Sequence, residues 1–238
     1  MRRALAFLTV LGGASAPSAD AVVWFPVVGA LLGLAVGGAW VGSEHAWPIV
    51  VAAAVAVTVD AILTGGLHLD GLADTGDGLL PALPRERRLS VMSDPHVGAF
   101  GVLATVVVLL LRFAAFAAGP AKFWIVAALW CGSRTVSAVI LLAGRYARAD
   151  GLATAFRAGN SAKLRLASVA FVGLAISVPA AVLDRPGHGL AALAAELAVG
   201  VGLLAFACRR LGGYTGDVLG AGIVLGETAG LLVWSARW

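Results

Sequence analysis

The sequence has little charge for its length. Of its 238 residues, 13% are charged and 60% are hydrophobic, and its mean hydropathy is +0.94. A soluble domain carries about 25% charged residues, so this chain cannot cover a water-facing surface of its size. The composition therefore excludes an ordinary soluble domain, a disordered chain and a fibrous protein. The class that remains is a membrane protein, which has lipid as its solvent.

Several familiar chemical signatures are also missing. The two cysteines, Cys131 and Cys208, both lie in apolar runs, which excludes a disulfide framework and a cysteine metal site and predicts two small core residues. The sequence contains no G-x-x-x-x-G-K-[ST] phosphate loop, no H-E-x-x-H helix and no G-x-S-x-G motif. The formal net charge is +4, but the basic residues are scattered, so we expect no nucleic-acid partner.

What the sequence does contain is a series of apolar runs, and a transmembrane helix needs about 20 such residues. The runs are Val22–Gly42, Pro48–Leu63, Gly98–Ala118, Phe123–Ala143, Leu166–Leu183, Gly189–Ala207 and Val218–Trp234. The second run is short and contains Asp60, so six spans are the alternative to seven. We predict an all-α polytopic membrane helix bundle with about seven transmembrane helices, in a single integral membrane domain over residues 1–238. The glycines at 29, 33 and 37 predict close helix packing.

Basic residues concentrate on one side of these spans. The N-terminus and the segments 64–97, 144–165 and 208–217 carry twelve Lys and Arg, whereas the opposite segments and the C-terminal tail carry three. The positive-inside rule makes the first group cytoplasmic, and because it holds nearly all the reactive side chains, we expect the active face there. The N-terminal run Ala4–Gly12 after Arg2 and Arg3 imitates a signal peptide, and we favour a retained interfacial or re-entrant segment.

The segment 64–78, TGGLHLDGLADTGDG, is the richest in reactive groups. Asp70, Asp74 and Asp77 have the spacing i, i+4 and i+7, which places three carboxylates on one face of a helix. Oxygen ligands suit Mg²⁺, and Mg²⁺ held by few carboxylates suits a phosphorylated substrate. Asp74 is also a candidate for proton transfer, and the glycines at 71, 76 and 78 would let phosphates approach the backbone. A polar turn of Asp and Gly is the alternative.

Three residues near this segment extend the candidate site. His68 is either a hydrogen-bonded packing residue or a substrate contact. Asp94 is a further candidate metal ligand, or a helix cap with Pro95 at the first helical position. His96 is a candidate general base, because imidazole exchanges protons near neutral pH.

Arginines supply candidate phosphate contacts. Arg145 and Arg148 follow the fourth span, where guanidinium groups either bind phosphate or anchor the span. Arg134 lies inside that span, so phosphate binding competes with ion pairing. Arg112 is also within a span and is expected to pair with a buried acid, because an unpaired intramembrane arginine is costly. The available acids are Asp60, Glu196 and Glu227.

The segment 212–217, GGYTGD, leads directly into the last span. A glycine-rich loop before a helix N-terminus is typical of an anion site, so Gly213 and Gly216 are candidate substrate contacts. Asp217 is a candidate base, a further carboxylate ligand or a helix cap.

Four of these segments resemble one known family. They are Phe25-Pro-Val-Val-Gly-Ala-Leu-Leu-Gly33, Leu63–Gly78, Arg145-Tyr-Ala-Arg148 and Gly216-Asp-Val-Leu-Gly-Ala221. Over about residues 5–233 the chain is similar to the cobalamin synthase family, and the Gly-Gly-x-His-x-Asp-Gly-x-x-Asp-x-x-Asp-Gly string is the most specific part. Asp60 departs from the family pattern, in which an apolar residue is expected.

The resemblance implies an adenosylcobinamide-GDP ribazoletransferase activity, the last step of cobalamin biosynthesis. Adenosylcobinamide-GDP and α-ribazole, or its 5′-phosphate, would give adenosylcobalamin, or its 5′-phosphate, plus GMP. The resemblance also implies Mg²⁺ as cofactor and a multi-pass inner-membrane location in the lipid bilayer. A homo-oligomer or a complex with other cobalamin-assembly proteins stays open.

Two other functions are weighed against this expectation. A CDP-alcohol type membrane phosphotransferase also uses spaced aspartates around Mg²⁺, but Asp70-Gly-Leu-Ala-Asp74 lacks the arginine of the D-G-x-x-A-R pattern. An ion-coupled transporter would explain charges within spans. A carrier, however, places its binding groups near the midplane, whereas most acids here lie at one surface, which favours an enzyme.

Overall fold

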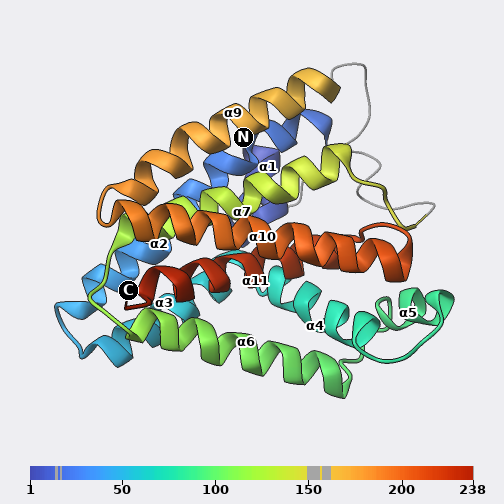
Figure 1. The fold of residues 1–238 in the computed structure, drawn as a ribbon, viewed down its shortest axis with the longest axis horizontal. Helices are drawn as coiled ribbons and strands as arrows, with labels where there is room; N and C mark the ends of the chain where they lie inside the picture. The colour runs from blue at the N-terminus through green and yellow to red at the C-terminus, as the bar shows by residue number, and fades with distance from the viewer. Residues whose placement is uncertain (14–15, 17, 149–155, 157–161, 238) are drawn as a thin grey trace.

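The computed structural model describes residues 1–13, 16, 18–148, 156 and 162–237, and this part of the chain is a helix bundle (Figure 1). Its long helices are α2 Phe25–Glu44, α3 Ile49–Thr64, α6 Ala99–Ala117, α7 Phe123–Ala143, α9 Ala162–Val182, α10 Pro186–Leu211 and α11 Gly216–Ser235. Each begins within a few residues of a predicted span. The all-α prediction is confirmed for the described residues, which form no strand beyond one isolated bridge.

The second predicted span, Pro48–Leu63, corresponds to α3, and the chain bends directly after it. Six of the described helices are long and apolar enough to cross a membrane, and α3 with α4 Leu67–Leu79 makes a seventh only as a pair with a 90° bend between them. The bend falls at Gly65 and Gly66, whose φ angles of 61° and 72° favour glycine. The chain is therefore a multi-pass membrane protein with six spanning helices, or seven if α3 and α4 together make one bent span.

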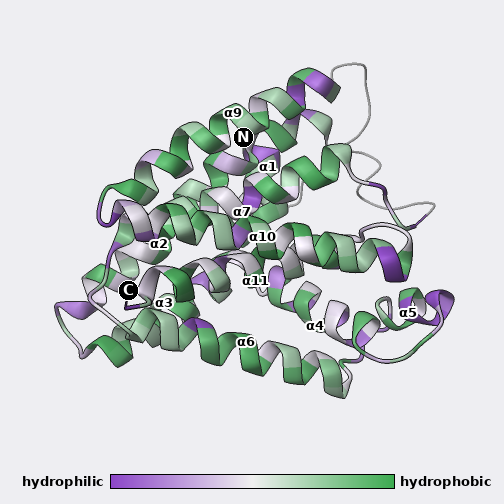
Figure 2. Ribbon diagram, viewed as in Figure 1, coloured by the Kyte–Doolittle hydropathy of each residue, from purple (hydrophilic) through white to green (hydrophobic). Residues whose placement is uncertain are grey.

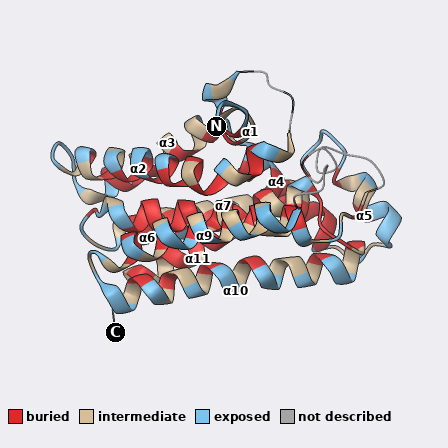
Figure 3. Cartoon of the chain, turned by 90° about the horizontal axis from the view of Figure 1, so that it is seen from above, coloured by how far each residue is buried: buried red, intermediate tan, exposed pale blue. Residues whose placement is uncertain are grey.

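The outer faces of the bundle are apolar and its interior is closely packed. Figure 2 shows hydrophobic residues along the outward faces of α6 and α10, and Figure 3 shows buried residues facing one another inside. Exposed side chains such as Leu103 and Leu197 would face lipid. Cys131 is buried as predicted, but Cys208 is exposed near the end of α10, so that prediction was wrong. An apolar run identifies a membrane helix without saying which of its residues face lipid.

The short elements are α1 Arg2–Leu8, η1 Val10–Gly12, η2 Ala19–Trp24 and α5 Arg85–Val91. The first of them, α1, packs against α2, with the rings of Phe7 and Phe25 stacked at 5.7 Å between centroids. The end of α4, all of α5 and the turn between α10 and α11 lie at one end of the bundle (right in Figure 1). We call this the basic end, because α5 and the last turn of α10 carry arginines there. Most of the predicted segment 144–165, namely 149–155 and 157–161, lies outside the described residues.

Close packing of α2 on α7 depends on the predicted glycine series Gly29, Gly33 and Gly37. A Cβ atom at Gly33 would lie 2.6 Å from Cα of Ala127, and one at Gly37 would lie 2.8 Å from Cα of Phe123. Such distances are shorter than any ordinary contact, so the two backbones approach as they do only where side chains are absent. The prediction of a small-residue packing face is confirmed.

We expect Gly33→Leu to destabilise the bundle by about 1–3 kcal/mol or more, because the new side chain must force α2 away from α7. The matched control is Gly38→Leu on the same helix, where nothing lies within 4 Å of an added Cβ. Thermal unfolding of the detergent-solubilised proteins measures the difference. Equal melting temperatures for the two variants would contradict this packing.

A network of buried charges joins the helices in the bundle interior. Arg112 of α6, 1% exposed, donates from Nη1 to Asp60 of α3 at 2.5 Å and from Nη2 to Glu227 of α11 at 2.5 Å. Its remaining donors reach Thr228 Oγ1 and the carbonyl oxygen of Val224, both at 3.2 Å. The expected ion pair of Arg112 is confirmed, with two acids rather than one. Asp60, unusual as a sequence feature, is one of these partners.

Helix α7 joins the same network through an aromatic residue and a second arginine. Trp130 donates from Nε1 to Asp60 at 2.8 Å, and the Arg112 guanidinium lies over its ring, 5.0 Å from the centroid. Arg134 is ion-paired with Glu227. Four helices, α3, α6, α7 and α11, therefore share one set of buried charges. Charges without water must be paired in this way, because an unpaired one costs several kcal/mol in lipid.

We expect Arg112→Met to lower stability by about 3–5 kcal/mol, because it leaves Asp60 without its arginine partner and Glu227 with Arg134 alone. The double change that also replaces Asp60 by Asn should recover much of this loss, because Glu227 keeps its ion pair with Arg134. Arg237→Met at an exposed position is the control. The measurement is denaturation in detergent, and an Arg112→Met variant as stable as the control would show that the network carries no folding energy.

Candidate functional site

A cavity of about 370 Å³ lies between α1, α4, α7 and α11, and we call it the α4–α11 cavity. Its size is in the range of small-molecule pockets. It is lined by apolar and aromatic side chains together with a few polar ones, which is the usual make-up of a ligand site. The polar lining residues are His68, Asp70, Ser137, Tyr146, Arg148 and Asp217.

Two carboxylates enter this cavity because α4 and α11 cross at glycines. A Cβ at Gly71 would lie 2.9 Å from the carbonyl oxygen of Asp217, and one at Gly220 would lie 3.4 Å from Cα of His68. The close crossing brings Asp70 of α4 and Asp217 of α11 to the same cavity. Gly71 therefore allows α4 and α11 to pack closely. Gly76 packs in the same way against α6, and Gly78 packs against the side chain of Met92. Gly71 also lines the cavity, whereas Gly76 and Gly78 do not.

A third carboxylate, Asp74, lies one turn further along α4. It interacts electrostatically with Asp217, Asp70 and Arg148. Asp70 is exposed and Asp74 is partly exposed, so both are open to a ligand. Asp217 of α11 thus adds a carboxylate beside those that the sequence places on α4, since Asp74 also interacts electrostatically with Asp77.

Asp77 accepts hydrogen bonds from the backbone at the start of α6. Its Oδ2 accepts from the backbone N–H of Gly98 at 2.6 Å, and its Oδ1 accepts from that of Gly101 at 2.8 Å. These N–H groups belong to the first turn of α6, where helical donors have no partner in their own helix. The side chain is 7% exposed. Asp77 therefore caps the start of α6 with both carboxylate oxygens, a role that the sequence did not predict, and its role as a metal ligand stays a prediction.

Asp94 and His96 form their own local pair on the surface. Asp94 Oδ1 accepts from the backbone N–H of His96 at 3.0 Å and lies 2.7 Å from His96 Nδ1. These hydrogen bonds hold the pKa of Asp94 below its usual value. The N-cap of α6 is Gly98, so Asp94 does not cap it and Pro95 does not begin it. Neither residue lines the α4–α11 cavity, and their predicted metal and base roles find no support in its geometry.

Arg148 is held at the cavity by an isolated β-bridge between Tyr146 and Tyr214. Ala147 N–H donates to the carbonyl oxygen of Tyr214 at 2.9 Å, and the N–H of Tyr214 donates to that of Arg145 at 2.9 Å. From this bridge Arg148 Nη2 reaches Asp217 Oδ2 at 3.4 Å. The guanidinium is one-third exposed, which leaves it open to an anion.

The other predicted substrate contacts divide into two groups. Gly216 lines the cavity, with nothing within 4 Å of an added Cβ, and so leaves room for a ligand. Gly213 instead packs on the bridge, where a Cβ would lie 2.3 Å from the carbonyl oxygen of Arg145, and the Arg145 side chain is exposed away from the cavity lining. Thr215, not Asp217, caps α11 by accepting from Val218 N–H at 3.3 Å.

Arg134 is far from a surface phosphate site. It is fully buried, paired with Glu227 and bonded to Ser133 Oγ at 2.9 Å. The pairing alternative stated from the sequence is the one observed, and the phosphate role is corrected. His68, 6% exposed, lines the cavity and makes no hydrogen bond to the described residues, so the substrate-contact alternative fits it better than a hydrogen-bonded packing role.

Sequence reasoning missed the aromatic part of the cavity. Phe7, Phe25 and Phe156 line it from segments that are far apart in the sequence. No spacing pattern connects these three positions. The one available signal was that the motif beginning at Phe25 places an aromatic side chain at the start of a predicted span.

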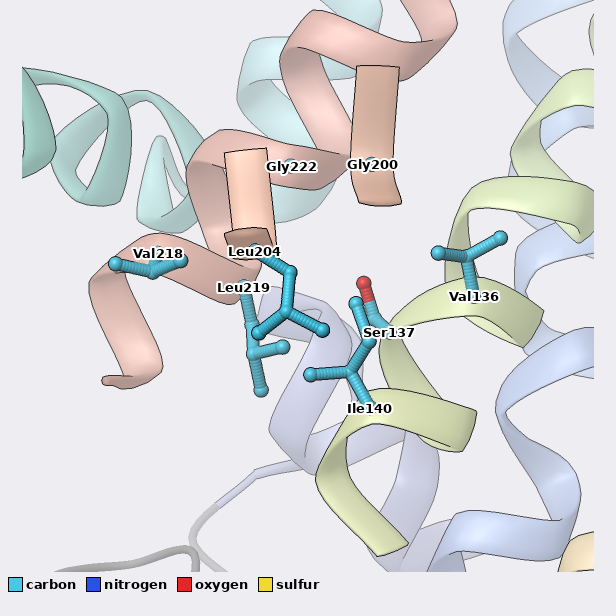
Figure 4. Close-up of a pocket in the computed structure, with 8 residues that line it drawn as sticks. All are labelled: Val136, Ser137, Ile140, Gly200, Leu204, Val218, Leu219 and Gly222. Atoms are coloured by element: carbon cyan, nitrogen blue, oxygen red, sulfur yellow. The ribbon is translucent and has the colours of Figure 1, made fainter. Parts of the chain in front are cut away.

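Two further hollows differ from this cavity. A gap of about 10 Å³ between α7, α10 and α11 is too small for a ligand (Figure 4). An apolar groove of about 600 Å³ lies between α7, α9 and α10 and includes the buried Glu196.

The residues that could hold a metal are limited. Within the described ranges, no three His, Cys, Asp or Glu side chains converge tightly enough to hold a metal ion by themselves. Asp70, Asp74 and Asp217 supply only carboxylate oxygens, which is the donor chemistry that Mg²⁺ prefers. This set suits an ion that takes its remaining ligands from water and a substrate phosphate.

The assembled motif on α4 and the motif at the start of α11 can now be compared with known proteins. A family model described as cobalamin-5-phosphate synthase matches residues 1–235. The chain belongs to the cobalamin-5-phosphate synthase family. A relative from Citrobacter koseri named adenosylcobinamide-GDP ribazoletransferase is 38% identical over 216 residues, which cover 89% of this chain and 85% of the relative. One of the same name from Escherichia coli O17:K52:H18 is 36% identical over 215 residues, with the same coverage.

No solved structure matches the chain. The cavity and its residues therefore describe this member of the cobalamin-5-phosphate synthase family from its own geometry. The family match spans every element that lines the cavity, from α1 to α11.

We expect Asp77→Ala and Asp70→Ala to differ in their effect on the stability of the fold. The first removes both acceptors at the start of α6 and should lower the melting temperature by an amount equivalent to about 1–2 kcal/mol, as loss of a helix cap does. The second should leave the melting temperature within about 0.5 kcal/mol of wild type, since Asp70 is exposed. Parallel thermal unfolding curves decide this, and the reverse ranking would contradict the capping role of Asp77.

Proposed function

We propose that this chain is an adenosylcobinamide-GDP ribazoletransferase that works by Mg²⁺-dependent displacement at phosphorus. One observation carries the proposal: Asp70 and Asp217, from α4 and α11, meet Arg148 in a single cavity. Family membership and the printed name of the relatives supply the substrates, adenosylcobinamide-GDP and α-ribazole or its 5′-phosphate. Carboxylates opposite a guanidinium suit a pyrophosphate bound through a divalent cation.

The donor set fits Mg²⁺. Asp70 and Asp74 would hold the ion from successive turns of α4, with the substrate pyrophosphate and water completing its coordination. When bound, the ion would neutralise charge on the substrate pyrophosphate, including the phosphate of the leaving GMP. Because the described residues offer no complete protein cage, we expect Mg²⁺ to bind weakly until the pyrophosphate substrate is present.

The remaining residues have separable tasks. Arg148 would bind phosphoryl oxygens and stabilise the charge that develops on them. Asp217, in the first turn of α11, would accept the proton of the attacking ribose hydroxyl. Its contacts with Arg148 and with Thr215 Oγ1, at 3.4 and 3.2 Å, hold the carboxylate in place before the substrate arrives.

The reaction then balances as one substitution. The hydroxyl oxygen of α-ribazole forms a new bond to the phosphorus attached to cobinamide. The bond from that phosphorus to the bridging oxygen breaks, and GMP leaves with the electron pair. The proton passes to Asp217, so the product is adenosylcobalamin, or its 5′-phosphate when the acceptor is phosphorylated.

The basic end of the bundle would face the cytoplasm of a cell whose inner membrane holds the protein. The bias of twelve to three in basic residues supports this orientation. The cavity opens among segments of that end, so water-soluble substrates would reach it from the cytoplasm.

The carrier alternative loses its main support. Of the four charges within spans that suggested it, Asp60, Arg112 and Glu227 are paired with one another inside the bundle, and Glu196 is buried at the groove between α7, α9 and α10. The CDP-alcohol phosphotransferase alternative requires an arginine that the segment Asp70-Gly-Leu-Ala-Asp74 does not contain, and the family match does not favour it.

The first test is a reaction of purified, detergent-solubilised protein with adenosylcobinamide-GDP and α-ribazole. We expect cobalamin and GMP in equal amounts with Mg²⁺ and none with EDTA. Asp70→Asn should lower kcat by at least about 100-fold, because charge neutralisation in the transition state is lost. Asp94→Asn, at the exposed loop, should stay within about twofold of wild type.

Folded protein that makes no corrinoid product would refute the activity. Equal rates with Mg²⁺ and EDTA would refute the metal role alone. A large loss in Asp94→Asn with full activity in Asp70→Asn would move the site from the α4–α11 cavity to the loop before α6.

A further inference from the structure

Three phenylalanine rings form one wall of the α4–α11 cavity, and we call Phe7, Phe25 and Phe156 the aromatic wall. Phe7 stacks on Phe25 at 5.7 Å and meets Phe156 edge to face at 4.9 Å. Phe25 and Phe156 meet edge to face at 5.9 Å. Phe25 and Phe156 are 2% and 1% exposed, and Phe7 is only partly buried, so the Phe7 ring is the most accessible of the three.

The aromatic wall is not needed for phosphate chemistry. Aspartates and arginine can bind a pyrophosphate in a polar, water-filled cleft, and an apolar wall would only weaken its hydration. The wall suits a flat ring that is poor in polar groups, because such rings gain dispersion and stacking energy against phenylalanine. The cavity therefore has surfaces for two different parts of a ligand.

We propose that the aromatic wall binds the base of the nucleoside acceptor and so aims its ribose hydroxyl at Asp217. This inference rests on the proposed function for the identity of the acceptor. The base of α-ribazole is a methylated two-ring heteroaromatic with no amino or carbonyl group, which matches a wall made only of hydrocarbon rings. The ribose is the polar part and belongs beside Asp70 and Asp217.

His68 would supply a hydrogen-bond donor for the base. The base has one unsubstituted ring nitrogen that accepts a hydrogen bond, and the imidazole of His68 lines the same cavity without a hydrogen-bond partner among the described residues. A neutral imidazole offers one N–H donor. One donor in an apolar surround suits a ring with one acceptor.

The other candidate occupants fit less well. Guanine would bury an amino group, a carbonyl group and ring nitrogens against phenylalanine, leaving them without partners at a cost of about 1–3 kcal/mol each. A corrinoid ring is several times larger than a nucleoside and exceeds a cavity of about 370 Å³. The nucleoside is the substrate component that this wall can hold.

The test is Phe7→Leu, which keeps an apolar side chain and removes the ring. We expect the KM for α-ribazole to rise about tenfold, while kcat and the KM for adenosylcobinamide-GDP stay within about twofold, because stacking on one ring contributes about 1–3 kcal/mol to binding a base. Phe171→Leu is the matched control, since that side chain is 74% exposed on α9. Unchanged KM for α-ribazole in a folded Phe7→Leu variant would overturn the proposal.

A binding measurement separates this inference from the activity on which it rests. Equilibrium dialysis of radiolabelled α-ribazole against the solubilised protein needs no corrinoid and no turnover. Binding by wild type that weakens about tenfold in Phe7→Leu would support the subsite even if no cobalamin is formed. Cobalamin synthesis with equal α-ribazole affinity in both proteins would refute the subsite while leaving the activity intact.

A second variant keeps the proposal testable if Phe7→Leu does not fold. Ile223→Phe narrows the cavity from α11 and should also lower α-ribazole affinity about tenfold. A series of nucleosides adds a readout that a structural defect would not change: wild type should prefer the methylated base over an adenine base, and both cavity variants should reduce that preference. An unchanged preference would count against base recognition by this wall.

Discussion

The pairing of Arg112 with Asp60 and Glu227 is the constraint on which the rest of the structure depends. Lipid provides no water to solvate a charge, so each of these groups must meet its partners inside the bundle. The partners come from α3, α6 and α11, and Arg134 adds α7 through the same Glu227. The relative rotation of four helices is therefore fixed by a few hydrogen-bonded charges, and dispersion between apolar faces alone would allow many rotations.

The active face follows from this arrangement. Asp60 holds the end of α3, the chain then bends by 90° at Gly65 and Gly66, and α4 is laid between α6 and α11. Because α11 is already oriented by Glu227, its opposite end brings Asp217 against Gly71 of α4. The carboxylate cluster is thus built from two helices that approach only because glycines allow it. Asp77 secures the other side of α4 by capping α6.

Much of this could be predicted from the sequence. Long apolar runs located the spans to within a few residues, because hydrocarbon thickness sets helix length. The i, i+4 spacing of Asp70 and Asp74 correctly placed both on α4, since a helix face is a local property. The contacts of Asp77 and Gly213 were not predicted for a common reason: their partners, the backbone at Gly98 and Gly101 and the backbone around Arg145, belong to other segments, and periodicity carries no information about such contacts.

The sequence by itself determined that this is a multi-pass helical membrane protein of the cobalamin-5-phosphate synthase family with its reactive groups at one end. Composition, run length and a contiguous motif are properties of the sequence, so they do not depend on how the helices are arranged. Only the tertiary structure decided that Asp217 joins Asp70 at one cavity, that Asp77 caps α6, and that three distant phenylalanines line the cavity. These depend on helix rotations and crossings, which are fixed by charge pairing and glycine contacts between segments far apart in the sequence.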